Sequence, residues 1–349
     1  GINAEYGDQI HVFNPVVQLQ QINSESSILQ LQNIPIEYAN GIRRGLHAEA
    51  PTVCIDKVQF LANTSSITEE MIAHRLGLLP IFVDKSRFDM MQYFYNCESS
   101  ATDQHNIDLE NAKVCESCMA FCNLDVQNNS NNILIVTDKD IQFRDSSFQA
   151  FSQFKNSNGV PIVKLGPTQR IAFRAVLVKA KGRVHAKWSP VAACPLTPVV
   201  RLNMQNVEKI LDIPQCKQHM IQYLNQVCCK GCFVIHADQL VEVRSQDCNL
   251  CDDCVRKPFI CEYNGQDLGY PFVVENGTVR LQNPVKPERV DGSFNLQIES
   301  IGVQTPKEIL LNTLDELING LEHIKDLPGF DQVSKEQIVE QVDQEDGFM

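Results

Sequence analysis

Residues 63–81 read Asn-Thr-Ser-Ser-Ile-Thr-Glu-Glu-Met-Ile-Ala-His-Arg-Leu-Gly-Leu-Leu-Pro-Ile and contain a full set of helix signals. The segment Ser66–Glu69 has the spacing of a capping box, and Pro80 ends the helical pattern. The apolar positions that recur at helical spacing are Ile72, Leu76 and Leu79. We therefore predict an amphipathic helix with His74 and Arg75 on its polar side, where no companion His or Glu supplies metal-ligand spacing.

A second helix is predicted just upstream, beginning at Ile36 and stopped by Pro51. Its apolar stripe consists of Ala39, Ile42, Leu46 and Ala50. Arg43 and Arg44 fall on its polar flank. This pair is either a solvated helix face or a contact with an acidic or larger partner surface.

Short β-strands are predicted around these helices. Near the N-terminus they are Val12-Phe13, 16–19 and 28–31. Between Phe143 and Val178, polar residues alternate with Val, Ile, Leu and Phe. This alternation predicts an antiparallel sheet in the middle of the chain.

The last predicted helix begins with a capping box at Thr305–Glu308 and has Pro306 at its first position. Its apolar stripe consists of Leu310, Leu314, Leu317, Leu321 and Ile324, and is widened by Leu311 and Ile318. Pro328-Gly329 then breaks the helix. The wide apolar face packs either on the domain's own core or on a partner subunit.

The composition limits the class of protein. The 349 residues include 43% hydrophobic residues, which is typical of globular chains, and no run approaches the ~20 apolar residues of a membrane span. A formal charge of -13 opposes binding to nucleic acid or anionic lipid. Because the first residues show no secretory signal, we expect an intracellular protein, in which the 14 cysteines favour metal binding over disulfides.

The sharpest cysteine motif is Cys248-x2-Cys251-x2-Cys254, which is typical of thiolates around an iron–sulfur cluster. Cys228 is our candidate for the fourth ligand, since a predicted hairpin over 233–243 would bring it close to the motif. The segment supports one [4Fe-4S] cluster at most. A zinc ion held by the same four thiolates stays an alternative.

A second constellation is Cys115-x2-Cys118 with Cys97 upstream. These three residues suit a structural zinc site, whose fourth ligand is Cys122 or His105. Both cysteine groups can fill a coordination sphere with protein ligands, which argues against a catalytic metal. No P-loop, dinucleotide-binding, zinc-protease or serine-hydrolase motif is present in the sequence.

Residues 63–81 closely resemble the signature stretch of the α-like subunits of cellular RNA polymerases. Residues 40–45 resemble the first dimer helix of that family, and residues 294–302 the strand before its last helix. Residues 185–190, with Trp188, are similar to a segment of the polymerase II branch. The region of Cys97 to Cys118 resembles that branch's zinc loop, and the set of four cysteines from Cys228 to Cys254 resembles the ferredoxin-like insert of archaeal relatives.

The resemblance implies an α+β fold with a discontinuous α/β dimerisation domain like that of the bacterial α subunit. This domain would comprise residues 1–50 and 263–349. A β-rich domain over 51–202, with the zinc loop, would interrupt it. A small ferredoxin-like metal-binding insert would occupy 203–262.

The resemblance also implies a noncatalytic assembly subunit of nuclear RNA polymerase II. Leu310, Leu314, Leu317 and Leu321 would pair with a smaller α-like subunit. Arg43, Arg44, His74 and Arg75 would contact the two largest subunits. The alternatives are the corresponding subunit of polymerases I and III, an archaeal-type subunit, and, from another class, a ferredoxin-type electron-transfer protein.

Overall fold

The computed structural model describes residues 14–97, 115–236, 239–263, 272–275 and 278–325. The chain divides into two compact units. The first unit consists of Gly1–Gln18, Gln30–Ile36 and Leu196–Asn295, and the second of Leu19–Leu29, Glu37–Pro195 and Leu296–Met349. The predicted strand Val12-Phe13, the candidate ligand His105 and the predicted helix end at Pro328-Gly329 lie outside the described residues.

The predicted N-terminal strands belong to a five-stranded sheet of order β1-β2-β18-β11, in which β12 also pairs with β18. Its strands are β1 (Val16–Gln21), β2 (Ser26–Gln32), β11 (Val191–Ala193), β12 (Leu196–Asn203) and β18 (Lys286–Ser300). Alternate residues of β2, namely Ser27, Leu29 and Leu31, are buried, as expected for a strand with one covered face. The predictions of strands near 16–19 and 28–31 are confirmed.

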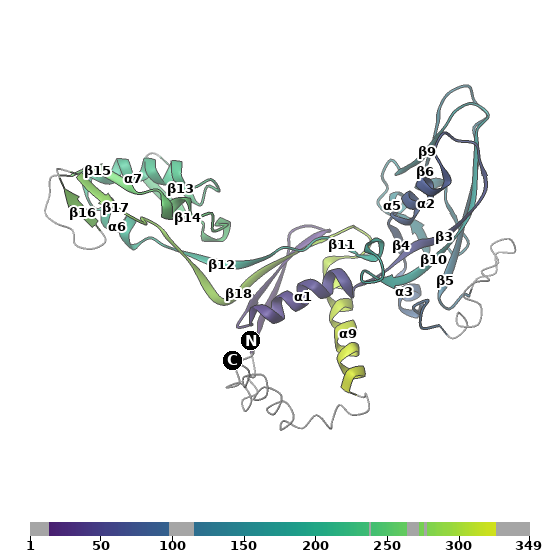
Figure 1. The fold of residues 1–349 in the computed structure, drawn as a ribbon, viewed down its shortest axis with the longest axis horizontal. Helices are drawn as coiled ribbons and strands as arrows, with labels where there is room; N and C mark the ends of the chain where they lie inside the picture. Colours follow the sequence, from purple (N-terminus) through teal and green to yellow (C-terminus); the bar gives the residue numbers. More distant parts are fainter. Residues whose placement is uncertain (1–13, 98–114, 237–238, 264–271, 276–277, 326–349) are drawn as a thin grey trace, which may run out of the picture. The chain divides into compact units, whose positions relative to one another are not determined.

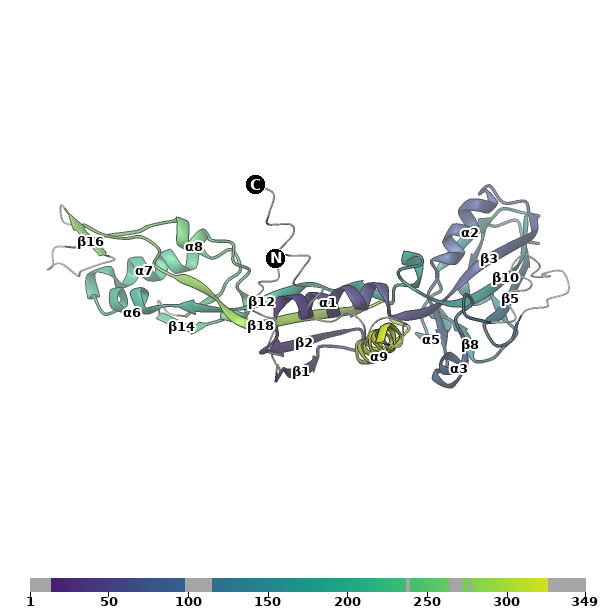
Figure 2. The same ribbon diagram turned by 60° about the horizontal axis from the view of Figure 1, so that its bottom comes forward.

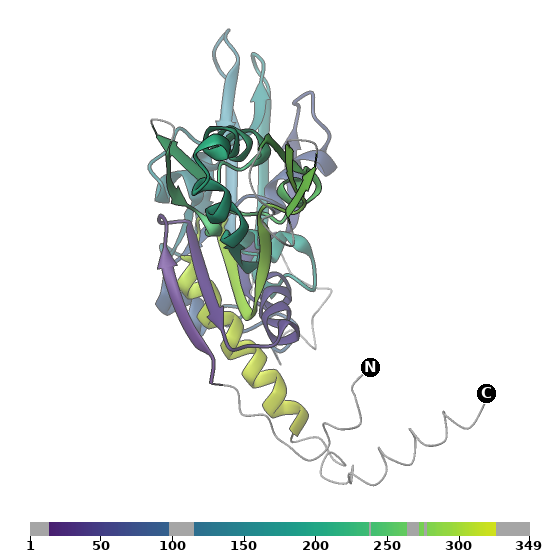
Figure 3. The same ribbon diagram turned by 90° about the vertical axis from the view of Figure 1, so that its left-hand side faces the viewer.

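Two helices of the second unit, α1 (Ile36–Ala48) and α9 (Pro306–Lys325), pack against each other. A Cβ added at Gly45 of α1 would lie 3.0 Å from Leu317 Cδ1 and 3.1 Å from Thr313 Cγ2 of α9, so the small residue permits close contact. Figure 2 shows α9 nearly end-on beside α1. The C-terminal half of α9 projects beyond α1 (Figures 1 and 3).

The predicted capping box of α9 is present. The Thr305 backbone N–H donates to Glu308 Oε2 at 2.9 Å, and the Glu308 N–H donates to Thr305 Oγ1 at 3.3 Å. Both partners therefore satisfy groups that a helix N-terminus leaves unpaired.

The middle of the chain is β-rich, as predicted. An antiparallel sheet of order β3-β10-β5-β7 forms its centre (Figure 1). Its strands are β3 (Pro51–Asn63), β5 (Met119–Gln127), β7 (Gln142–Phe143) and β10 (Arg170–Lys181). Two smaller antiparallel pairs are β4 (Ile81–Val83) with β8 (Phe148–Ala150), and β6 (Leu134–Thr137) with β9 (Pro161–Leu165). The short helices here are α3 (Lys85–Met90) and α5 (Phe151–Phe154).

Helix α2 (Glu69–Gly77) confirms the helix predicted within 63–81, and its Ile72 and Leu76 are fully buried in the core beside Phe173. The predicted capping box is wrong, because α2 begins only at Glu69 and the side chain of its N-cap residue, Thr68, makes no capping hydrogen bond. Upstream polar residues bond among themselves instead. Asn63 Nδ2 donates to the Ile67 carbonyl at 3.0 Å, and the Ser65 hydroxyl donates to Asn63 Oδ1 at 2.7 Å.

The first unit holds a separate core of helices and short strands. They are α6 (Gln205–Leu211), α7 (Pro214–Val227), β13 (Phe233–His236), β14 (Gln239–Val243), α8 (Asp253–Arg256), β15 (Phe259–Glu262), β16 (Phe272–Glu275) and β17 (Thr278–Leu281). Strands β13 and β14 pair antiparallel, as predicted. Strands β15 and β17, which lie on either side of residue 262 in the sequence, pair antiparallel. Among the described residues, no helix combines the length and apolar character needed to cross a membrane.

Candidate functional site

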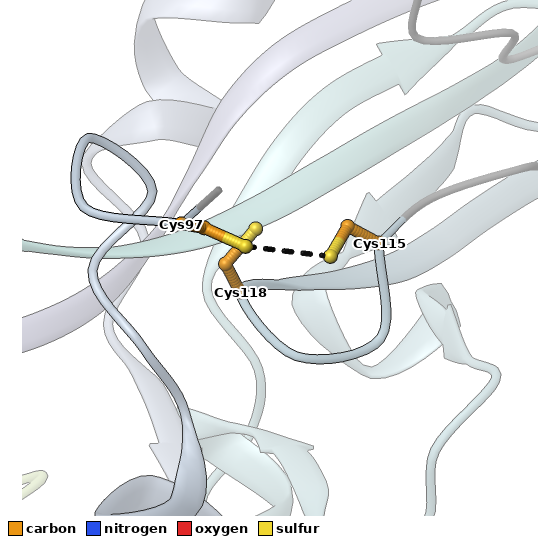
Figure 4. Close-up of side chains that lie close together, drawn as sticks. All are labelled: Cys97, Cys115 and Cys118. Atoms are coloured by element: carbon orange, nitrogen blue, oxygen red, sulfur yellow. Dashed lines mark hydrogen bonds between the residues drawn. The ribbon is translucent and has the colours of Figure 1, made fainter. Parts of the chain in front are cut away.

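Three cysteines of the predicted zinc loop converge in the second unit (Figure 4). Cys97 follows α3 along the chain, whereas Cys115 and Cys118 belong to the turn that leads into β5. The three sulfur atoms lie within 4.8 Å of one another, and Cys97 Sγ is 3.7 Å from Cys115 Sγ. Two Zn–S bonds of about 2.3 Å at a tetrahedral angle place sulfurs about 3.8 Å apart, so this thiol trio suits zinc.

The thiol trio also favours one anionic sulfur. Burial opposes ionisation of Cys115, but hydrogen bonds from the Ser117 backbone and from the thiols of Cys118 and Cys97 lower its pKa to about 7. Burial, followed by hydrogen bonds with its two neighbours, raises the pKa of Cys118. The shared protons would be released when a metal binds, because the thiolate is the ligand form.

The structure does not bring Cys122 to the thiol trio. Cys122 lies on β5, fully buried among the apolar residues of the second unit, and burial raises its pKa to about 12. Such a side chain behaves as a small hydrophobic residue. The thiol trio therefore offers three possible metal ligands, and Cys122 does not lie with them.

The cysteines of the predicted insert site line one pocket of the first unit. They are Cys228, Cys248, Cys251 and Cys254, and the walls between them include Leu202, Val227, Phe233 and Leu250. Several soft sulfurs in a largely apolar lining suit a thiolate-bound cluster. No three of the four sulfurs all lie within 4.8 Å of one another, so the structure does not bring them to the spacing of a zinc site. The antiparallel pair β13–β14 lies between Cys228 and Cys248 in the sequence, as the hairpin argument requires.

The sulfur of Cys228 accepts hydrogen bonds from the backbone that follows it. Its sulfur accepts the Cys232 backbone N–H at 3.4 Å. Burial opposes ionisation, but backbone N–H groups of Cys232, Lys230 and Gly231 lower the pKa of Cys228. Gly231 adopts a φ of 66°, a left-handed conformation that glycine enters easily and that turns the backbone toward the sulfur.

Two neighbouring cysteines that the sequence argument did not use lie at the same site. Cys232 lines the pocket and is almost fully buried. Cys229 is exposed, and its thiol donates to Cys251 Sγ at 3.8 Å. Cys229, Cys251 and Asp253 form a further group whose ligand atoms lie within 4.8 Å. The spacing Cys229-x2-Cys232 is the sequence signal that could have identified both residues.

The apolar residues of α9 face two ways. Leu310 is buried and Leu317 lies against α1, so these two of the four predicted interface leucines belong largely to the chain's own core. The exposed apolar residues are Leu311 at 49%, Ile318 at 51% and Leu321 at 67%. We call these three residues the α9 face. Leu314 is partly buried between the two sides.

The polar candidates lie on two helices. On α1, Arg43 Nε donates to Asn40 Oδ1 at 2.9 Å, and Arg44 is exposed. On α2 and at the residue that follows it, exposed side chains at spacings of three and four residues form one face, which we call the α2 face: Met71, His74, Arg75 and Leu78. Arg75 also donates to the Pro161 carbonyl. The α2 face thus combines two basic side chains, His74 and Arg75, with two apolar ones, Met71 and Leu78.

A family model described as the RNA polymerase Rpb3/Rpb11 dimerisation domain matches residues 29–321. DNA-directed RNA polymerase II subunit rpb3 of Dictyostelium discoideum is 29% identical over 317 residues, which cover 89% of this chain and 94% of that protein. The rpac1 subunit of RNA polymerases I and III from the same organism is 29% identical, covering 86% and 81%. Subunit 3 of RNA polymerases II, IV and V of Arabidopsis thaliana is 25% identical, covering 89% and 90%.

The family model extends across residues of both units, including α1, α2, the cysteine pocket and most of α9. The match is therefore not confined to one motif. The chain belongs to the family of the RNA polymerase Rpb3/Rpb11 dimerisation domain, the α-like subunits of RNA polymerase.

Proposed function

We propose that this chain is the noncatalytic α-like assembly subunit of DNA-directed RNA polymerase II. It pairs with a smaller α-like subunit to form the platform on which the two largest subunits assemble. The observation that carries the proposal is the α9 face, because Leu311, Ile318 and Leu321 are exposed on a helix that the dimerisation-domain model covers up to residue 321. An exposed apolar row of this kind is typical of a protein interface.

The surfaces available for the larger subunits are the α2 face and the basic flank of α1. His74 and Arg75 supply charge beside the exposed Met71 and Leu78, and Arg44 supplies charge on α1. Arginine beside apolar contacts is frequent at interface hot spots. These residues, with Arg43, are therefore our candidates for contacts with the two largest subunits.

The metal groups in this proposal have structural roles. Zinc at Cys97, Cys115 and Cys118 would close the loop before β5, with a fourth ligand from another residue or from solvent. One [4Fe-4S] cluster or zinc at Cys228, Cys248, Cys251 and Cys254 would order the ferredoxin-like insert. In both cases binding would stabilise local structure, because the ligands come from separate segments.

The polymerase class rests on two observations. The match covers 94% of the length of the polymerase II relative, but 81% of the length of the relative from polymerases I and III. Trp188, in the segment that resembles the polymerase II branch, is buried and donates through Nε1 to the Val178 carbonyl at 3.2 Å. Both observations support the proposal that the protein works in the nucleus with polymerase II.

The test is affinity purification of the tagged chain from its native cell, with mass spectrometry of the partners and metal analysis of the same sample. We expect a smaller α-like subunit and the two largest subunits of polymerase II. Recovery of the large subunits of polymerase I or III would reassign the class. Recovery of reductases, or of the chain alone, would contradict the assembly function.

A further inference from the structure

A surface group of the first unit has the geometry of a separate metal site. It consists of Cys229, Cys251 and Asp253, whose ligand atoms all lie within 4.8 Å of one another. The two sulfur atoms are 3.8 Å apart, which matches the separation of about 3.8 Å for two Zn–S bonds at a tetrahedral angle. Within the described ranges, the thiol trio of the second unit is the only other group of three such residues at this spacing.

Two segments that are tied together supply these ligands. Cys229 lies two residues after the end of α7, and Asp253 is the first residue of α8. The Tyr223 hydroxyl of α7 donates to the carbonyl of Lys257, the residue after α8, at 2.6 Å. This hydrogen bond links α8 to α7, so the ligands on the two segments keep their spacing.

The backbone on both sides of Cys251 fixes the position of its thiol. Leu250 and Asp252 have φ angles of 58° and 63°, in the left-handed region that residues other than glycine seldom enter. Such conformations persist where the surrounding structure imposes them, and they are concentrated at functional sites. Cys251 and Cys229 are both exposed, so an ion in solution can reach both sulfurs.

The types of ligand select the class of ion. Thiolate sulfur is soft and suits zinc, whereas calcium and magnesium take oxygen ligands. Two thiolates and one carboxylate carry three negative charges, which favour a divalent cation over a monovalent one. A tetrahedral zinc ion with three protein ligands keeps its fourth position for water.

We propose that Cys229, Cys251 and Asp253 bind one zinc ion at the surface of the first unit. Binding forms two Zn–S bonds and one Zn–O bond and releases the two thiol protons to solvent, because the thiolate is the ligand form. Cys251 also lines the cysteine pocket, so this zinc ion takes one of the four thiolates proposed there for a cluster. The site uses residues of this chain alone, so it holds or fails independently of the polymerase assignment.

The experiment measures alkylation of each thiol in the full-length chain, stripped of metal and kept reduced with a phosphine, by peptide mass spectrometry. Cys229 and Cys251 should react readily before zinc chloride is added, because both are exposed. Excess zinc should slow alkylation of both thiols at least about tenfold, since a metal-bound thiolate is a poor nucleophile. Cys229→Ser should abolish the protection of Cys251. Asp253→Asn should raise the zinc concentration for half-protection at least about tenfold.

The matched control is Asp252→Asn, which removes the same charge at the neighbouring exposed residue and should leave the protection unchanged. Asparagine tolerates the left-handed φ at this position. Cys228→Ser, which changes the pocket but not the surface group, should also leave the protection unchanged. Three results overturn the site: zinc leaves Cys229 reactive, Asp253→Asn behaves as Asp252→Asn, or Cys228→Ser abolishes the protection, which would place the ion in the pocket.

Discussion

At the scale of single residues, the space around a glycine predicts whether substitution is tolerated. A Cβ at Gly182 would overlap the carbonyl oxygen of His47 in the last turn of α1, whereas a Cβ at Gly41 would meet nothing within 4 Å. We expect Gly182→Ala to lower the free energy of unfolding by about 1–3 kcal/mol, because the contact is with backbone. Gly41→Ala should raise it by about 0.5–1 kcal/mol. Urea unfolding measures both, and equal effects at the two sites would contradict the structure.

Single substitutions also test which cysteines of the zinc loop bind zinc. Cys118→Ser should remove about one zinc ion per chain, because its sulfur lies with those of Cys97 and Cys115. Cys122→Ala should keep the zinc and lose only some core packing, since Cys122 lies in the apolar core. The measurement is zinc content of the purified protein by mass spectrometry. Loss of zinc in Cys122→Ala would return Cys122 to the ligand set.

At the scale of elements, a buried charge network joins α9 to β10 and to the end of α1. Lys181 Nζ lies 2.6 Å from Glu316 Oε2 and 3.0 Å from Glu49 Oε2, and the Tyr93 hydroxyl donates to Glu316. Lys181→Met would leave Glu316 without a cationic partner and Glu49 with only the more distant Arg183, and should lower the free energy of unfolding by about 3 kcal/mol. Lys155→Met, which breaks an exposed pair with Glu25, should cost less than about 1 kcal/mol.

The pH dependence of this network has a definite sign. Burial lowers the pKa of Lys181, but hydrogen bonds and charge from Glu316 and Glu49 outweigh it, and the net shift is upward. The folded state therefore holds the proton more tightly than the unfolded state, and the stabilisation is complete below the unfolded pKa of about 10.4. The difference between wild type and Lys181→Met should be constant from pH 7 to 9 and shrink as the pH rises through the raised value. A difference that changes between pH 7 and 9 would disprove this account.

The local fold of the insert, residues 203–262, should depend on metal bound in the cysteine pocket. Replacing both Cys251 and Cys254 with Ser removes two thiols from the cysteine pocket, and we expect faster amide hydrogen exchange across 203–262. Exchange in α1 and α9 should stay slow, because these helices belong to the second unit. Cys194→Ala, at a buried cysteine of the second unit, serves as the control. Unchanged exchange in the insert would show that the pocket does not order it.

Local periodicity predicts much of these elements, and what it misses has physical causes. The box at Thr305–Glu308 forms as predicted because α9 begins directly after Thr305, which places Thr305 and Glu308 where they can bond each other. The similar box at Ser66 fails because α2 begins only at Glu69, so that Thr68 and not Ser66 is the residue before the helix. The thiol trio converges as predicted, whereas Cys122 has the right spacing but lies on a strand residue that faces the core. The inward and outward sides of α9 depend on where Gly45 lies, which no local pattern contains.

At the scale of the whole molecule, the exposed apolar residues predict how the chain behaves without a partner. They include Ile36, Tyr38, Leu311, Ile318 and Leu321 on the two packed helices. We expect the chain expressed alone to self-associate, and co-expression with the smaller α-like subunit to give a soluble heterodimer. Light scattering after gel filtration measures both states.

Changing Ile318 and Leu321 together to Asp should separate these two behaviours. Burying each side chain contributes about 1.5–3 kcal/mol, so their loss should raise the Kd of the heterodimer at least about 100-fold. The same variant should self-associate less, because the charged residues stay in water. Leu61→Asp introduces one such charge at an exposed leucine near the end of β3 and should pair as wild type. If the double variant pairs with unchanged affinity, then α9 contacts the partner through its first half, and the residues beyond Leu317 are exposed for another reason.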